Sequence, residues 1–430
     1  MERIIIQGGR RLEGRVSVSG SKNATLPLMA AALLADSPSV ITNVPELRDI
    51  QTMADVLRSL GAAVSFSANT LTIDPAGFAN TEAPYDIVRK MRASIYVMGP
   101  MLGRLHRAKV SLPGGCAIGP RPIDLHLKGF EALGARIQLE HGYVIANAES
   151  LRGADFNLLG ASGSSVGATC NVLMAAVMAE GESVIHGAAC EPDVVELIHF
   201  LSRMGASIEG AGTSTLRIAG GKALHGVEHR VIADRIEAGT FMTAAAITRS
   251  CIVIENAPLH HMEATTAKLA EIGVAIEPAD GGVAVRGDTG NFRPTSITTG
   301  VYPGFATDMQ AQFMALLATV PGTSIIRETI YVDRFMHAAE LNRMGANIRV
   351  LSGVATVEGV ERLSGAPVMA SDLRASAALV IAGLAAEGTT IVNRIYHIDR
   401  GYEHIERKLR AVGAAIARVS DAEPEPQLPE

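Results

Sequence analysis

The pattern of apolar and polar positions repeats six times along the chain. Each repeat contains an amphipathic stretch with helical spacing, such as residues 53–60, followed by a strand-like alternation, such as residues 346–350. A glycine lies between the two in every repeat, where a helix C-terminal cap is expected. These glycines are 68 to 73 residues apart, at Gly61, Gly134, Gly205, Gly273, Gly345 and Gly413. The pattern therefore predicts six copies of a unit about 70 residues long.

A second helical segment occurs in most repeats and is apolar nearly all round. Examples are residues 172–180, 241–248, 313–319 and 376–386, and each leads into a short strand, at residues 183–185, 252–254, 323–326 and 389–392. A helix with no polar face is expected to be buried. The unit is therefore predicted to be mixed α/β, with three units packed around these helices in each of two compact domains.

Composition excludes several classes of function. The 430 residues carry a net charge of −6, only 4% are aromatic and tryptophan is absent, which disfavours nucleic-acid binding. The four cysteines form no C-x-x-C pair, so neither a disulfide framework nor a zinc site is indicated. The N-terminus lacks the layout of a signal peptide, and the longest apolar run, residues 375–386, is too short to span a membrane. These features predict a soluble cytoplasmic protein with no membrane partner.

A polar loop joins the strand to the amphipathic helix in every repeat. The six loops are residues 43–49, 113–124, 189–193, 256–261, 329–334 and 395–400. Loops that open helices present free N–H groups and the positive end of the helix dipole, which together favour anions. Asp49 and Asp193 are expected to cap their helices rather than to bind a ligand.

The loop of the second repeat places one thiol, Cys116, among three glycines and three prolines. A structural cysteine and a functional thiol are both compatible with this loop taken alone. Cations lower the pKa of a nearby thiol, which would let Cys116 act as a nucleophile or a proton carrier. The other cysteines, Cys170, Cys190 and Cys251, lie in apolar segments and are predicted to be structural.

Six cationic residues lie at positions that are predicted to be loops. They are Lys22, Arg92, Arg121, Arg334, Arg374 and Arg400. Arginine keeps its charge when desolvated and binds phosphate or carboxylate through two N–H groups. The spread of these residues over both halves of the chain predicts a shared cleft for a polyanion. Asp308 follows a Gly/Pro turn and is either a helix N-cap or a general base, and the residue pattern alone favours the cap.

Eight stretches together resemble the UDP-N-acetylglucosamine 1-carboxyvinyltransferases, the enolpyruvyl transferases of peptidoglycan synthesis. They are spread over nearly the whole chain, at residues 20–23, 90–94, 112–125, 165–169, 307–312, 342–346, 372–375 and 394–401. The cysteine loop is the most specific of them. The resemblance implies a two-domain inside-out α/β barrel, with residues 22–230 as one domain, residues 1–21 and 231–418 as the other, and a disordered tail at residues 419–430.

The resemblance also implies the reaction and its participants. The enolpyruvyl group of phosphoenolpyruvate is expected to pass to the 3′-hydroxyl of UDP-N-acetylglucosamine, with release of phosphate and with no metal or other cofactor. Cys116 would protonate the methylene carbon of phosphoenolpyruvate and would be the site of a phospholactoyl adduct. Asp308 would take the hydroxyl proton, and Lys22 and Arg400 would complete the catalytic set.

The substrate-binding residues that the resemblance implies fall into two groups. For phosphoenolpyruvate they are Lys22, Asn23, Arg121 and Arg400 at the phosphate, with Arg334 and Arg374 near the carboxylate. For the sugar nucleotide they are Arg92, Arg121, Pro122, Ile123, Asp124, Leu125, Gly163, Ser164, Ser165, Val166, Asp308 and Ile330. Asp372 is expected in the same site.

Two other interpretations stay open. Cys190, Ala233 and Ala306 stand where this family usually has Arg, Pro and Pro, which is compatible with a related transferase that uses another hydroxyl acceptor. A UDP-sugar sensor without catalytic activity would bind the nucleotide and release no phosphate.

Overall fold

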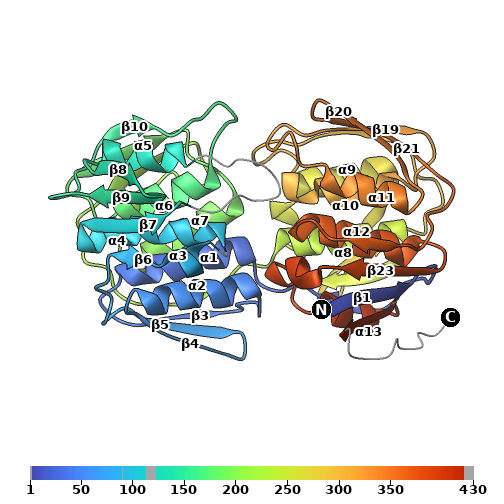
Figure 1. Cartoon of the computed structure of the whole chain (residues 1–430), viewed down its shortest axis with the longest axis horizontal. Helices are drawn as coiled ribbons and strands as arrows, with labels where there is room; N and C mark the ends of the chain where they lie inside the picture. The colour runs from blue at the N-terminus through green and yellow to red at the C-terminus, as the bar shows by residue number, and fades with distance from the viewer. Residues whose placement is uncertain (1, 90, 113–122, 421–430) are drawn as a thin grey trace. The chain divides into compact units, whose positions relative to one another are not determined.

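The chain folds into two compact units (Figure 1). The computed structural model describes residues 2–89, 91–112 and 123–420. Within these ranges, the N-terminal unit comprises residues 20–112 and 123–232, and the C-terminal unit comprises residues 2–19 and 233–420. The two units have the same plan, and each is described by itself.

The N-terminal unit contains three helix–strand–helix–hairpin repeats. Its helices are α1 (Lys22–Ala31), η1 (Ala32–Leu34), α2 (Arg48–Ser59), α3 (Tyr85–Val88), η2 (Arg92–Val97), α4 (Met98–Leu105), α5 (Asp124–Ala132), α6 (Val166–Ala176) and α7 (Pro192–Arg203), where η denotes a 3₁₀ helix. Its strands are β3 (Ser39–Thr42), β4 (Ala63–Ser67), β5 (Thr70–Asp74), β6 (Glu82–Ala83), β7 (Arg107–Ser111), β8 (Arg136–Glu140), β9 (Tyr143–Asn147), β10 (Asp155–Asn157), β11 (Glu182–His186), β12 (Ser207–Glu209), β13 (Thr215–Ala219) and β14 (Glu228–Arg230).

The C-terminal unit contains the other three repeats. Its helices are α8 (Arg235–Ile247), η3 (Leu259–His261), α9 (Glu263–Ile272), η4 (Thr307–Met309), α10 (Gln310–Leu317), α11 (Met336–Arg343), α12 (Leu373–Ala385), η5 (Ile395–Arg400) and α13 (Ile405–Ala411). Its strands are β1 (Glu2–Gln7), β2 (Arg15–Ser17), β15 (Cys251–Glu255), β16 (Ala275–Ala279), β17 (Gly282–Arg286), β18 (Ser296–Thr298), β19 (Thr323–Arg327), β20 (Asn347–Leu351), β21 (Val354–Glu358), β22 (Pro367–Met369), β23 (Thr389–Asn393) and β24 (Ala415–Ser420).

The strands of the described residues form six four-stranded sheets with one common order. A short first strand runs parallel to the second, and an antiparallel pair lies on the other side of the second strand. This pair is a hairpin in five of the sheets, and in the sixth it consists of β1 and β24. The sheets are β14-β3-β5-β4, β6-β7-β9-β8 and β10-β11-β13-β12 in the N-terminal unit, and β2-β15-β17-β16, β18-β19-β21-β20 and β22-β23-β1-β24 in the C-terminal unit. The prediction of six mixed α/β units is confirmed.

The short strands join neighbouring repeats into a ring within each unit. In the N-terminal unit, β14 at the end of the third repeat returns to pair with β3 of the first. In the C-terminal unit, β1 lies between β23 and β24 and so completes the sixth repeat, while β2 passes on to β15. Each unit therefore closes on itself, and the N-terminal strand is an inner strand of its sheet.

The last strand extends further than the sequence analysis expected. Val419 and Ser420, which were assigned to a disordered tail, belong to β24 and pair with Arg3 and Glu2 of β1. The prediction was wrong at these two residues because their pairing partner lies at the opposite end of the chain. The rest of the expected tail, residues 421–430, lies outside the described residues.

The inner helix of each repeat is buried on nearly all sides, as its lack of a polar face predicts. In the C-terminal unit α8, α10 and α12 contact one another, and Figure 1 shows the strands of this unit around them. In the N-terminal unit α6 contacts α1 and α4. Alanine and glycine allow such close approach, and the core of each unit forms around these helices. Among the helices of the described residues, none is long and apolar enough to cross a bilayer.

The six glycines that follow the outer helices adopt the conformation that the cap prediction requires. Their φ angles lie between 89° and 114°. Residues with a Cβ are disfavoured in this left-handed region, whereas glycine enters it readily and lets the chain reverse from helix into strand. The repeat pattern of the sequence therefore has a direct conformational cause.

Candidate active site

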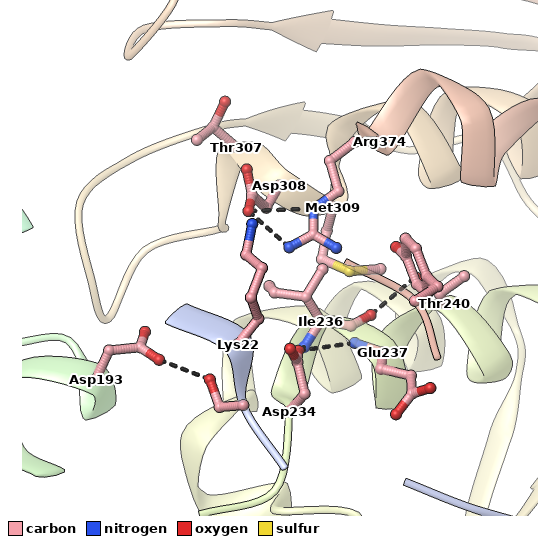
Figure 2. A network of polar contacts seen from close by, with 12 residues as sticks. Lys22, Asp193, Asp234, Ile236, Glu237, Thr240, Thr307, Asp308, Met309 and Arg374 are labelled. Atoms are coloured by element: carbon pink, nitrogen blue, oxygen red, sulfur yellow. Dashed lines mark hydrogen bonds and ion pairs between the residues drawn. The ribbon is translucent and has the colours of Figure 1, made fainter. Parts of the chain in front are cut away.

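Asp308 lies at the start of α10, where the other inner helices of the C-terminal unit carry an N-cap. Asp234 accepts the N–H groups of Ile236 and Glu237 at 2.8 and 3.0 Å and so caps α8 (Figure 2). Asp372 caps α12 in the same way. Before α10 the chain instead makes the 3₁₀ turn η4, and among the described residues no side chain caps η4 or α10. The N-cap interpretation of Asp308 was wrong, because its carboxylate binds other groups.

Those groups are two buried arginines. Arg334 Nη1 donates to Asp308 Oδ1 at 2.8 Å, and Arg374 donates to Oδ2 from Nη2 at 2.9 Å and from Nε at 3.2 Å. The arginine side chains are only 5% and 2% exposed, whereas that of Asp308 is 28% exposed. The carboxylate is therefore the more accessible partner of a buried cationic pair. Figure 2 shows the Asp308 carboxylate joined to the Arg374 guanidinium.

The charges around the two arginines keep them protonated despite burial. Burial by itself lowers the pKa of Arg334, but Asp308 and Asp372 raise it above its ordinary value. For Arg374 the lowering by burial is also outweighed, by Tyr402, Asp308 and Asp234, so that its pKa is raised. The guanidinium carbon of Arg374 lies 5.3 Å from the centre of the Tyr402 ring. Both arginines are thus permanent cations beside a carboxylate.

The structure places the remaining predicted residues of this unit as follows. Arg400 is the last residue of η5. Burial is the main cause that lowers the pKa of His397, and the positive charge of Arg400 is the second. Asp372 acts on the same histidine in the opposite direction. Ile330 lies in the loop after β19, where its amide donates to Glu328 Oε1 at 2.8 Å. Arg374 lies in the first turn of α12, so its assignment to a loop was wrong.

In the N-terminal unit, Lys22 is the first residue of α1 and not a loop residue as expected. Its ammonium lies 3.5 Å from Asp49 Oδ2, and the neighbouring N-cap Ser21 donates to Asp193 Oδ1 at 2.9 Å. Asp49 and Asp193 were expected to cap α2 and α7, but in the described residues no side chain caps either helix. The two aspartates instead fix the start of α1, and Asn23 follows there, half-buried. The cap prediction failed because both carboxylates turn to a different helix.

The predicted sugar-nucleotide residues of this unit lie at the beginnings of three helices. Arg92 begins η2, residues 123–125 are the N-cap and first two residues of α5, and residues 163–166 end on the first residue of α6. Ser165 is the N-cap of α6 and accepts the Ala168 amide at 3.3 Å. A Cβ at Gly160 would meet Leu125 at 3.0 Å, so the approach to α6 passes against the start of α5. The helices α5 and α6 therefore pack together, and α6 also contacts η2, whose first residue is Arg92.

His126 of α5 links these helices, although no local sequence pattern indicated such a role. His126 is 3% exposed, and its Nδ1 lies 3.0 Å from Asn171 Nδ2. Asn171 Oδ1 accepts the Gly99 amide at 2.7 Å, so Nδ2 faces the imidazole and Nε2 must carry the ring proton. Burial first, and the charge of Arg92 second, lower the pKa of His126 to about 3. The pair of His126 and Asn171 could not be found from the sequence, because the two side chains meet only when α5 and α6 pack together.

This pKa predicts how acid acts on the protein. The pKa of His126 is about 3 in the folded protein, below the reference value of 6.5. The contribution of the neutral side chain to the free energy of unfolding is therefore complete above pH 6.5 and declines as the pH falls. Between pH 7.5 and pH 5 the wild type should lose about 2 kcal/mol of stability that His126→Gln does not lose. Urea unfolding of both proteins at the two pH values measures this difference.

The matched control is His199→Gln on α7, where the histidine is exposed. This variant should lose stability with acid as the wild type does. If His126→Gln and the wild type respond equally to acid, His126 does not become protonated on unfolding in this range, and its assignment as a neutral buried base is wrong.

Part of the expected site lies outside the described residues, namely Cys116, Arg121 and Pro122. The three described cysteines are free thiols. Cys170 is buried, and burial, followed by the charges of Asp193 and Glu191, raises its pKa well above the ordinary value. Such a thiol stays protonated and unreactive, which agrees with the structural role expected for it.

The described residues can perform two chemical tasks. In the C-terminal unit, Arg334 and Arg374 present N–H groups that suit a carboxylate or phosphate, and Asp308 can accept a proton. In the N-terminal unit, Lys22 supplies a buried ammonium, and the helix starts near Arg92 suit a phosphate-containing ligand.

Known proteins are similar to the chain over nearly its whole length. Residues 6–409 match the family described as EPSP synthase (3-phosphoshikimate 1-carboxyvinyltransferase). A protein of Carboxydothermus hydrogenoformans named UDP-N-acetylglucosamine 1-carboxyvinyltransferase 2 is 55% identical over 98% of this chain and 100% of its own. A protein of Trichlorobacter lovleyi named UDP-N-acetylglucosamine 1-carboxyvinyltransferase is 56% identical over the same shares.

Solved structures extend the likeness to the fold. The enolpyruvyl transferase NikO from Streptomyces tendae gives a TM-score of 0.88 at 27% identity and covers 97% of this chain and 98% of its own. EPSP synthase from Acinetobacter baumannii gives a TM-score of 0.74 at 17% identity, covering 98% of this chain and 100% of its own, and supports the fold alone.

Proposed function

The chain belongs to the enolpyruvyl transferase family and, within it, to the UDP-N-acetylglucosamine 1-carboxyvinyltransferases, and from this premise we propose how its residues carry the reaction. The resemblance drawn from the sequence, with its inside-out α/β fold, is confirmed. The protein transfers the enolpyruvyl group of phosphoenolpyruvate to the 3′-hydroxyl of UDP-N-acetylglucosamine and releases phosphate. This is the first committed step of peptidoglycan synthesis.

Asp308 is the residue on which the proposal depends most. It takes the proton of the sugar hydroxyl as that oxygen bonds to C2 of phosphoenolpyruvate. The placement that supports this role is the departure of Asp308 from the capping position that Asp234 and Asp372 keep, because this leaves a partly exposed carboxylate able to accept a proton. Its two arginines hold it in a fixed orientation.

The same two arginines are suited to the carboxylate of phosphoenolpyruvate. They already bind the Asp308 carboxylate through three hydrogen bonds, so their N–H groups suit a carboxylate. A substrate carboxylate that binds Arg334 and Arg374 competes with Asp308 for them. Phosphoenolpyruvate binding therefore weakens the hold of the arginines on Asp308 and makes this carboxylate a stronger base when the substrate is present.

The phosphate of phosphoenolpyruvate requires separate cations. We assign it to Lys22, Asn23, Arg121 and Arg400, of which Lys22 is a nearly buried ammonium beside Asp49. The positive charges of Lys22, Arg121 and Arg400 stabilise the phosphate as it leaves, and the site residues need no metal for this purpose. Arg121 is assigned from the sequence, since it lies outside the described residues.

The sugar nucleotide is assigned mainly to the helix starts of the N-terminal unit. Its proposed contacts are Arg92, residues 121–125 and residues 163–166, together with Asp308 and Ile330. The free N–H groups at the starts of α5 and α6 support a diphosphate there, since anions are favoured at helix N-termini.

Cys116 completes the catalytic set from the sequence. Its thiol donates a proton to C3 of phosphoenolpyruvate while the hydroxyl oxygen adds to C2, which gives a tetrahedral intermediate. The Cys116 thiolate then takes a proton from C3 while the bond from C2 to the phosphate oxygen breaks, which restores the enol double bond. The departing phosphate carries away the proton that Asp308 took from the hydroxyl. Arg121 follows five residues along the sequence, and a cation near the thiol would lower its pKa and ease this proton transfer.

We further propose that the two compact units are the domains expected at residues 22–230 and at residues 1–21 with 231–418. The cytoplasm is the proposed compartment, because the described cysteines are thiols, as is usual where the environment is reducing.

A phosphate-release assay with purified protein and both substrates tests the proposed function. Phosphate should appear only when phosphoenolpyruvate and UDP-N-acetylglucosamine are both present, in equal amount to the enolpyruvyl product. Release with a different hydroxyl compound but not with this nucleotide would point to a transferase with another acceptor. Binding of the nucleotide with no release of phosphate would point to a sensor.

A further inference from the structure

Glu328 is a buried carboxylate directly after β19, and the proposed reaction gives it no role. It is 2% exposed. Its Oε1 accepts the Thr299 hydroxyl at 2.8 Å and the amides of Ile330 and Tyr331 at 2.8 and 3.0 Å, and its Oε2 accepts the Thr307 hydroxyl at 2.9 Å. One side chain thus joins the loop that carries Ile330 to the turn before Asp308.

The hydrogen bond from Thr307 to Glu328 fixes the direction of the threonine hydroxyl proton. A carboxylate only accepts hydrogen bonds, so the single hydroxyl proton of Thr307 must point at Glu328. The lone pairs of the same oxygen then face Arg334, whose Nη1 donates to it at 3.1 Å. The same Nη1 lies 2.8 Å from Asp308 Oδ1. A chain of hydrogen bonds therefore runs from Glu328 through Thr307 to the arginine.

We propose that Glu328 is a positioning residue, which through the Thr307 hydroxyl holds the Arg334 guanidinium in the orientation that phosphoenolpyruvate requires. The inference rests on the proposed function, because it assigns the substrate carboxylate to Arg334. Glu328 also fixes the backbone of residues 330 and 331 through their amides. It touches no substrate and acts through these neighbours.

The chemistry of the side chain explains why a carboxylate is needed. The amides of Ile330 and Tyr331 cannot turn their donors away, so the oxygen of a glutamine at position 328 would have to face them. Its NH₂ group would then face Thr307, and the threonine proton would be displaced toward Arg334. The NH₂ group and the Arg334 guanidinium would then both donate to the Thr307 oxygen, while the threonine proton would point at the guanidinium. The arginine would have to move.

Steady-state kinetics of phosphate release test this chain. Glu328→Gln and Thr307→Val should each raise the KM for phosphoenolpyruvate about tenfold, the effect of losing one hydrogen bond to a charged group. Thr307→Ser keeps the hydroxyl and should restore the KM. The double variant with Gln at 328 and Val at 307 should be little worse than either single variant, because both changes break the same chain.

The matched control is Glu358→Gln. Glu358 Oε2 accepts the Thr323 hydroxyl at 2.8 Å in the same sheet, but this pair is exposed, and the change should leave both KM values unaltered. A lower kcat with an unchanged KM would show loss of folded protein only and would overturn the inference, as would additive effects in the double variant. If Glu328→Gln does not fold, the comparison of Val with Ser at position 307 decides. Absence of phosphate release by the wild type would instead reject the proposed function.

Discussion

Cys116→Ser is expected to lower phosphate release at least about a hundredfold, the lower end of what a positioned proton donor contributes. A serine hydroxyl is a far weaker acid than a thiol, so it cannot give its proton to C3 of phosphoenolpyruvate at neutral pH. Folding should be unaffected, because the two side chains are similar in size. The assay is phosphate release with both substrates, with a thermal melt to confirm that the variant is folded.

The chain offers matched controls for this change. Cys190→Ser and Cys251→Ser replace half-buried thiols that the proposed reaction does not use, and both should keep full activity. A Cys116→Ser variant as active as these controls would remove the thiol from the mechanism.

A covalent label gives an independent measurement. The epoxide fosfomycin should be opened by the Cys116 thiolate, because Arg121 follows five residues along the sequence and a cation near a thiol raises its thiolate fraction. Peptide mass spectrometry should find the added mass on the peptide that contains residue 116 and not on those with residues 190 or 251. A label on another cysteine would contradict the assignment.

The repeat architecture could be predicted from the sequence because its cause is local. A glycine after each outer helix is required by the φ angle at that position, whatever the rest of the chain does. The inner helices could be found for the same reason, since a segment with no polar face has to be buried wherever it packs. The pairing of β24 with β1 could not be predicted from the sequence, because the two strands lie at opposite ends of the chain.

The candidate site shows the same limit. Lys22, Arg334 and Arg374 were found as residues, but the partners that give them their chemistry lie in other repeats or on other helices. Arg374 is 66 positions from Asp308 in the sequence, and no local pattern connects the two. Asp49 was expected to be a cap because that is the common local role, and only packing turns it to Lys22.

Asp308→Asn is expected to lower kcat by about 10² to 10⁴, the usual range for a general base, because an amide cannot take the hydroxyl proton. Binding of UDP-N-acetylglucosamine should change much less than kcat. Removing the carboxylate also leaves Arg334 and Arg374 buried with less negative charge beside them, so the melting temperature should fall. Phosphate release and a thermal melt measure the two effects.

The binding of phosphoenolpyruvate separates this mechanism from simple damage to the site. If the substrate carboxylate competes with Asp308 for the two arginines, the Asn variant should bind phosphoenolpyruvate at least as tightly as the wild type by calorimetry, and the ligand should raise its melting temperature by more. Asp234→Asn is the matched control, since asparagine also caps a helix and turnover should be retained. Weaker phosphoenolpyruvate binding by Asp308→Asn would mean that the carboxylate orients the arginines for the substrate and does not compete with it, and turnover close to that of the wild type would remove Asp308 as the base.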